Sequence, residues 1–333
     1  MTTSIKHSQR TFQSDFGKVA YDLYEPALDV ALPVRIIQIA HGMVEHKGRY
    51  CWVAHELAKN GYIVAISDHR GHGESVNAES KITLGEMGED GFQKAAYDLY
   101  KLNCTLKELY PKAEIILLGH SMGSLLARRY LLLYGDSICA LILSGTPAYN
   151  PLLPLGIWLG RAFGFFDLAI VKNLGAKVLN RLSFGGFNKK LLKHNKMKRK
   201  QTPSLDSAKA NNMRWLCSDN QVVQEYITDP KCDFIFSLQS FLNLFHGTQE
   251  VYSPNYPEPK NPLLPVLFVS GYDDACGDFG EGVQKARIHL QTQGYKDVEI
   301  ILYQDARHEI LNEPHIKQQV IQDILLWLRD RLK

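Results

Sequence analysis

One serine in this sequence lies in a pattern that can make it a nucleophile. Ser121 is the centre of Gly119-His120-Ser121-Met122-Gly123, a G-x-S-x-G pattern. In that pattern the serine sits on a strained turn between a strand and a helix, and the glycines two residues to either side let both elements pass without a clash. The pattern therefore predicts a serine that attacks an electrophilic carbon.

The residues around Ser121 supply the strand and the helix that the pattern requires. The uninterrupted apolar run at residues 115–118 predicts a buried strand. After the turn, apolar side chains at helical spacing predict a helix, namely Leu125, Leu126, Tyr130 and Leu133. A serine between a strand and a helix is a stronger signal than the five residues alone.

Two further residues could form a catalytic triad with Ser121. Asp274 and His308 each follow a predicted strand, as Ser121 does, and in an open parallel sheet catalytic groups gather beyond the carboxyl ends of the strands. The chain order Ser, Asp, His is that of the α/β-hydrolases. We expect His308 to take the Ser121 proton and pass it to the leaving group, while the Asp274 carboxylate fixes the imidazole tautomer.

The tetrahedral intermediate of such a reaction needs hydrogen-bond donors for its oxyanion. One donor should be the backbone N–H of Met122, directly after the nucleophile. The other should come from an earlier strand-to-helix loop, where His41-Gly42-Met43 lies, and we assign it to Met43.

The remaining elements predict an α/β fold that places these residues at one edge of a sheet. Residues 12–14 and 19–24 flank Asp15-Phe16-Gly17 and predict an N-terminal β-hairpin. Further strands are expected at 34–40, 62–67, 140–143, 265–270 and 298–303, with amphipathic helices between them. This alternation predicts a mostly parallel sheet with helices on both faces.

The alternation stops in the middle of the chain, where we expect an inserted helical cap. We therefore divide the chain into a first core part at 1–146, the cap at 147–261 and a second core part at 262–333. Residues 138–160 carry no charge, but prolines within the run argue against a membrane span. Two interpretations of residues 152–166 remain open: the core of an inserted domain, or a lipid-facing lid whose Trp158 and Phe163 line an acyl pocket. A basic run at 189–200 is expected to be a solvated face, with transient contact with a membrane surface as the alternative.

Composition excludes several other classes of protein. A formal charge of +3 over 333 residues, without an aromatic-basic pattern, does not favour nucleic-acid binding. The six cysteines include no C-x-x-C pair, and the polar N-terminus lacks an export signal, so free thiols in the cytoplasm are expected. Nucleotide and metal motifs are absent, so neither a cofactor nor a metal is expected.

The chain resembles the monoacylglycerol lipase and lysophospholipase branch of the α/β-hydrolases, a group also labelled serine aminopeptidase-like. The resemblance rests on residues 41–50, 68–75, 119–123 and 307–313, in both halves of the predicted core. It implies that Met43 and Met122 hold the oxyanion and that Glu45 and Arg49 form a structural pair near the pocket. The family's glycine, followed three residues later by the catalytic acid, selects Asp274 over Asp273.

By this resemblance the protein is a serine hydrolase that cleaves carboxylic esters through an acyl-enzyme, with monoacylglycerols or lysophospholipids as substrates. Two alternatives stay open. A small-peptide aminopeptidase would use the same triad, but it needs an acidic anchor for the substrate's amino group, and no compact acidic cluster stands out in the cap. A non-catalytic ligand receptor could also be built on a hydrolase fold.

Overall fold

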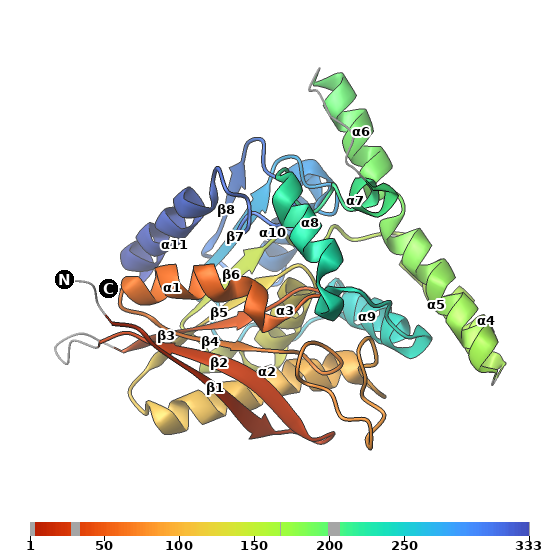
Figure 1. Ribbon diagram of the computed structural model, residues 1–333. Coiled ribbons are helices and arrows are strands. Elements are labelled where there is room, and N and C mark those ends of the chain that lie inside the picture. Colours follow the sequence, from red (N-terminus) through yellow and green to blue (C-terminus); the bar gives the residue numbers. More distant parts are fainter. Residues whose placement is uncertain (1–3, 28–33, 167, 199–206, 333) are drawn as a thin grey trace.

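An eight-stranded sheet runs through the centre of the protein (Figure 1). The computed structural model describes residues 4–27, 34–166, 168–198 and 207–332, so Arg199 and Lys200 of the basic run lie outside the described residues. The strands are β1 (Lys6–Gln13), β2 (Lys18–Glu25), β3 (Arg35–Ala40), β4 (Ile63–Ser67), β5 (Glu114–His120), β6 (Ala140–Ser144), β7 (Val266–Gly271) and β8 (Val298–Tyr303). Their order is β1-β2-β4-β3-β5-β6-β7-β8. All pairs from β4 to β8 are parallel.

The expected N-terminal hairpin forms the antiparallel edge of this sheet. β1 pairs with β2, and β2 pairs antiparallel with β4. Gly17 has φ +138°, and the N–H of Ser14 donates to the Gly17 carbonyl over 2.7 Å. Glycine tolerates this backbone geometry because it has no Cβ, which explains why the hairpin turns here.

Helices cover both faces of the sheet and bury two separate apolar layers. One layer lies under α1 (Cys51–Lys59) and α11 (Lys317–Arg331). The other lies under α2 (Gly91–Leu109), α3 (Met122–Tyr134) and α10 (Glu281–Thr292). Neighbouring strand residues divide between the layers, as Ile36 and Ile37 do, because successive side chains of a strand point to opposite faces. The predicted α/β-hydrolase fold is confirmed.

Six helices lie between β6 and β7, and we call them the inserted helices. They are α4 (Leu153–Phe165), α5 (Ala169–Phe184), α6 (Phe187–Met197), α7 (Ala208–Asn212), α8 (Asn220–Thr228) and α9 (Leu238–Val251). α9 packs against α2 and α3, whereas α4, α5 and α6 extend outward from the sheet (Figure 1). Short 3₁₀ helices occur at η1 (Lys47–Tyr50), η2 (Gly135–Ser137), η3 (Pro230–Cys232) and η4 (Asp278–Gly280). Within the described residues, no helix has both the length and the apolar character needed to cross a membrane.

Candidate active site

Ser121 occupies the turn between β5 and α3 in a strained backbone conformation. Its φ and ψ are 52° and −119°, which a residue with a side chain rarely adopts. The two flanking glycines make the turn possible. A Cβ at Gly119 would lie 2.3 Å from the Gly123 carbonyl oxygen, and a Cβ at Gly123 would lie 2.1 Å from that of Ala40. Any larger residue would force strand and helix apart.

The structure brings Ser121, His308 and Asp274 into one hydrogen-bonded chain. His308 Nε2 lies 2.8 Å from Ser121 Oγ, and His308 Nδ1 lies 3.0 Å from Asp274 Oδ2. Because an ionised carboxylate only accepts hydrogen bonds, Nδ1 donates to Asp274 and Nε2 is left to accept from the serine hydroxyl. The backbone N–H of Cys276 donates to Asp274 Oδ1 over 2.8 Å and holds the carboxylate in place.

Burial and charge act in opposite directions on His308. Burial alone would lower the pKa of His308, but the adjacent Asp274 carboxylate raises that pKa above its ordinary value. A base with a raised pKa holds a transferred proton well, which suits a group that must carry a proton from nucleophile to leaving group.

Asp273, the neighbouring acid, faces a different partner. Its Oδ1 atom pairs with His194 Nε2 at 3.0 Å and with Lys198 Nζ at 2.8 Å, and both belong to the α6 region. Asp273 therefore links the inserted helices to the core, while Asp274 faces His308.

The backbone N–H groups of Met43 and Met122 border the same site. Both residues line the cavity that contains Ser121, and in the part of the chain that the structure describes neither N–H donates to another group. Met122 is the first residue of α3, where N–H groups have no partner within the helix. Two available donors beside Ser121 fit an oxyanion hole.

A buried ion network ties the Met43 loop to the His308 loop. Arg49 Nη1 donates to Glu45 Oε2 over 2.9 Å, and both Arg49 Nη atoms donate to the Glu309 carboxylate over 2.7 Å. Glu45 Oε1 in turn accepts from the N–H of Gly42, next to Met43, and from Tyr50 Oη. The structure therefore extends the pair expected from the family resemblance to a triad, because Glu309 directly follows His308.

The two carboxylates of this network differ in pKa. Burial raises the pKa of Glu45, although Arg49 counteracts it. Burial would also raise the pKa of Glu309, but its two-pronged contact with Arg49 lowers that pKa below the ordinary value. One guanidinium thus serves two buried acids and stabilises the charge of Glu309 the more strongly.

A cavity of about 520 Å³ opens beside Ser121. Its size suits a ligand with one acyl chain or a drug-sized molecule. Its wall is largely apolar and comes from α3, α4, α5 and α9, through Leu125, Leu155, Leu159, Leu179, Leu182, Leu244 and Phe245. Among the described lining residues, Lys190 and Asp278 are the two that carry charge, and our sequence analysis did not identify either as functional.

Trp158 and Phe163, which we expected in an acyl pocket, do not line this cavity. Leu155 and Leu159 lie one helical turn apart and face it, whereas Trp158 lies on another side of α4 and is 64% exposed. Phe163 packs against α5, where a Cβ at Gly175 would meet the Phe163 Cβ at 2.7 Å. The expectation is wrong for both residues, because α4 is apolar nearly all round and its sequence does not show which face points inward.

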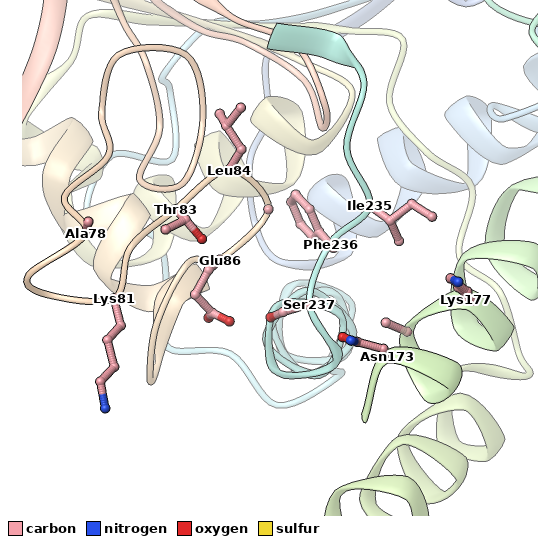
Figure 2. A pocket seen from close by; sticks show the side chains of 12 residues that line it. Ala78, Lys81, Thr83, Leu84, Glu86, Asn173, Lys177, Ile235, Phe236 and Ser237 are labelled. Atoms are coloured by element: carbon pink, nitrogen blue, oxygen red, sulfur yellow. The ribbon is translucent and has the colours of Figure 1, made fainter. Parts of the chain in front are cut away.

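A second cavity, of about 560 Å³, lies away from this site (Figure 2). Figure 2 shows Lys81 and Glu86 on a core loop, Ser237 before α9, and Asn173 and Lys177 on α5 around it. None of the candidate catalytic residues lines it. The cavity at Ser121 is therefore the candidate substrate site.

One cluster has the residue types of a metal site. Ligand atoms of His46, Asp229 and Cys232 lie within 4.8 Å of one another. His46 Nδ1 accepts from the N–H of Gly48, so Nε2 carries the ring proton and donates to Asp229 over 2.8 Å. Burial also raises the pKa of the Cys232 thiol, which would have to ionise to bind a metal. The cluster is satisfied as a hydrogen-bonded link between the core and the inserted helices.

Four further histidines near the site are buried and neutral. Burial lowers the pKa of His69 to about 4 and the pKa values of His72 and His120 to about 3, and it lowers the pKa of His41 as well. His41 Nε2 accepts from the N–H of His69 over 3.0 Å, and His69 Nε2 donates to the His41 carbonyl. These rings shape the loop before Met43 and do not contact Ser121 Oγ in the described structure.

The fold and this site define an α/β-hydrolase. The sequence model of the family described as "Serine aminopeptidase, S33" matches residues 32–315, so the chain belongs to that family. A monoacylglycerol lipase of Mycolicibacterium smegmatis is 25% identical over 99% of both chains, and a monoglyceride lipase of Mus musculus is 24% identical over 90% of this chain and 84% of its own.

A solved structure agrees with these relatives. The thermostable carboxyl esterase from Bacillus coagulans in complex with glycerol has a TM-score of 0.80 and 25% identity, covering 99% of this chain and 100% of the esterase. The resemblance to the monoacylglycerol lipase-like branch is confirmed, and the chain is a carboxylic ester hydrolase.

Proposed function

We propose that this protein hydrolyses single-chain lipid esters, monoacylglycerols or lysophospholipids, through an acyl-enzyme on Ser121. The observation that carries the proposal is a serine hydroxyl 2.8 Å from His308 Nε2 at the wall of a largely apolar cavity of about 520 Å³. The names of the monoacylglycerol lipase and monoglyceride lipase relatives support the same substrate class.

In the proposed mechanism, Ser121 Oγ attacks the ester carbonyl carbon as His308 Nε2 takes the hydroxyl proton. The carbonyl oxygen becomes an oxyanion that accepts from the N–H groups of Met43 and Met122. When the intermediate collapses, the bond to the alcohol breaks and His308 returns the proton to the leaving oxygen. Water then attacks the acyl-enzyme with His308 as base, which releases the fatty acid and restores the Ser121 hydroxyl.

We infer that residues 147–261 form a cap on a hydrolase core made of 1–146 and 262–333. The inserted helices supply most of the apolar cavity wall, as a cap that selects substrates would. Six free cysteine thiols favour a reducing compartment, and we propose the cytoplasm.

We propose that the outer side of the cap makes transient contact with a membrane surface. Trp158, Phe165 and Ile170 are 64%, 85% and 84% exposed, and clustered exposed apolar side chains mark interaction sites. The double substitution Phe165→Ser and Ile170→Ser should reduce co-sedimentation with phosphatidylcholine vesicles. Leu326→Ser, at a 55% exposed residue of α11, is the matched control and should retain it.

An aminopeptidase with the same triad is the competing function. It would need a carboxylate in the cavity for the substrate's amino group, and Asp278, the acidic side chain among the described lining residues, is already paired with Lys190 at 3.2 Å. The geometry therefore favours esters.

A panel of substrates tests the proposal. We expect kcat/KM for p-nitrophenyl esters to rise with acyl length until the cavity is full, because each buried methylene contributes up to about 0.8 kcal/mol. Monoolein or oleoyl lysophosphatidylcholine should be hydrolysed, and aminoacyl-anilides should not. A flat chain-length profile, or faster cleavage of the anilides, would contradict the proposed substrate class.

A further inference from the structure

The largely apolar cavity has one charged place in its wall, an ion pair between Lys190 and Asp278. Lys190 Nζ lies 3.2 Å from Asp278 Oδ1, and the two side chains are 53% and 39% exposed. Both residues border the cavity that contains Ser121. An accessible ion pair in the wall of a substrate cavity can exchange its partners for charges on a ligand at low cost, because water screens much of its own attraction.

The pair lies on the side of the cavity from which His308 serves the leaving group. The His308 ring packs against Trp215 with centroids 5.1 Å apart, and Trp215 packs against Phe187 at 4.9 Å. Lys190 follows Phe187 by three residues on α6, so the two share a helix face. An ester's alcohol portion must lie near His308 to receive its proton, which places the headgroup of a lipid ester toward Lys190.

The backbone that presents Asp278 is strained. Asp278 and Phe279 have φ values of 51° and 57°, and positive φ is a genuine outlier for a bulky residue such as phenylalanine. The Phe279 ring stacks on His194 at 4.0 Å, and the N–H of Phe279 donates to the Asp274 carbonyl over 2.8 Å. Such strain persists where surrounding contacts impose it, and it is concentrated at binding and catalytic sites.

A purely structural role for the pair is the simpler alternative. It would link α6 to η4, but Lys198 and His194 already join the α6 region to Asp273. A partly exposed pair adds little to such a link. The cavity position of both charges is left without a purpose by that interpretation.

We propose that Lys190 and Asp278 form a binding site for a zwitterionic lipid headgroup, with Lys190 binding the phosphodiester and Asp278 the ammonium group. The inference rests on the proposed function and narrows it to lysophospholipids such as lysophosphatidylcholine and lysophosphatidylethanolamine. A neutral glycerol headgroup offers no charge to either residue. An anionic headgroup without an ammonium group satisfies Lys190 but approaches the Asp278 carboxylate, whereas a zwitterion satisfies both.

The test compares four oleoyl esters in micelles of a neutral detergent: lysophosphatidylcholine, lysophosphatidylethanolamine, lysophosphatidylglycerol and monoolein. We expect Lys190→Met to lower kcat/KM for all three lysophospholipids relative to monoolein by about tenfold, the effect of losing one charged hydrogen bond. Asp278→Asn should lower the ratio for the two zwitterions and raise it for lysophosphatidylglycerol. Lys193→Met, at an exposed lysine on the same helix, is the control and should keep the wild-type ratios.

Equilibrium binding of the same lipids to Ser121→Ala separates the headgroup site from catalysis. Tighter binding of lysophosphatidylcholine than of monoolein, lost in both charge variants on this background, supports the site whether or not turnover is seen. Unchanged ratios in both variants, with the fold intact by circular dichroism, overturn the inference while monoolein turnover upholds the proposed function. If no ester is turned over by the wild type, the proposed function fails, and the binding preference alone decides the headgroup site.

Discussion

Removing the Arg49 guanidinium should destabilise the fold and the active site together. Arg49, Glu45 and Glu309 are 11%, 4% and 4% exposed in their side chains, so the three charges are almost fully buried. In Arg49→Met two carboxylates would remain in the interior without a cation. Breaking a buried ion pair by removing one partner costs about 3 to 5 kcal/mol, because the remaining charge is desolvated and unpaired.

The contacts that Arg49 loses are consistent with the upper part of that range. Its three hydrogen bonds to carboxylates are 2.7 to 2.9 Å long, and its guanidinium also lies 4.9 Å from the centre of the Tyr226 ring. Hydrogen bonds to charged groups contribute about 1.5 to 3 kcal/mol each. Protonation of Glu45 offsets part of the loss, because burial already raises the pKa of that carboxyl.

Urea unfolding measures this loss as a lower transition midpoint at an unchanged slope. The control is Arg129→Met, because the Arg129 pair with the half-exposed Glu250 spans 3.5 Å and should be worth no more than about 1 kcal/mol. The triple variant Glu45→Gln, Arg49→Met, Glu309→Gln removes the unpaired charges and should recover part of the stability. A loss below about 1 kcal/mol in Arg49→Met, or a triple variant less stable than Arg49→Met, would refute this account of the network.

Three further changes test the site and its surroundings. Asp274→Asn should lower kcat by about 10³ to 10⁴ and move the acidic limb of the pH profile to lower pH, since the carboxylate raises the pKa of His308, whereas Asp273→Asn should loosen α6 with little effect on kcat; equal losses in both would contradict the assignment. Leu159→Trp should shorten the preferred acyl chain of p-nitrophenyl esters, because Leu159 lines the cavity, and an unchanged optimum would place the acyl chain elsewhere. The neutral histidines should make the protein sensitive to acid: at pH 5 the folded state leaves His69, His72 and His120 unprotonated while the unfolded chain protonates them, so each costs about 2 kcal/mol between pH 6.5 and 5. Urea midpoints that do not fall over this range would show that these rings are protonated in the folded protein.

The core of the fold could be predicted because its signals are local. The apolar run before Ser121 and the two glycines specify a strand and a turn that only small residues permit. The hairpin at Gly17 and the strand ends near Asp274 and His308 follow from similarly short patterns. Each of these signals lies within about ten residues of the feature that it predicts.

The cavity could not be predicted because its wall depends on long-range packing. Nearly every side of α4 is apolar, so its sequence does not separate Leu159, which faces the cavity, from Trp158, which faces outward. Lys190 and Asp278 are 88 residues apart and meet only because α6 folds back over the loop after Asp274. Isolated charges of this kind have no spacing that marks them as a pair.

Reaction with a fluorophosphonate probe, followed by mass spectrometry of the labelled peptide, tests the central claim most directly. A serine activated by a general base attacks electrophilic phosphorus as it attacks an ester carbon. We expect one covalent adduct on Ser121 in the wild-type protein, with loss of ester hydrolysis in proportion to labelling, and no adduct in Ser121→Ala. An adduct that persists in Ser121→Ala, or hydrolysis that survives complete labelling of Ser121, would contradict the assignment of Ser121 as the nucleophile.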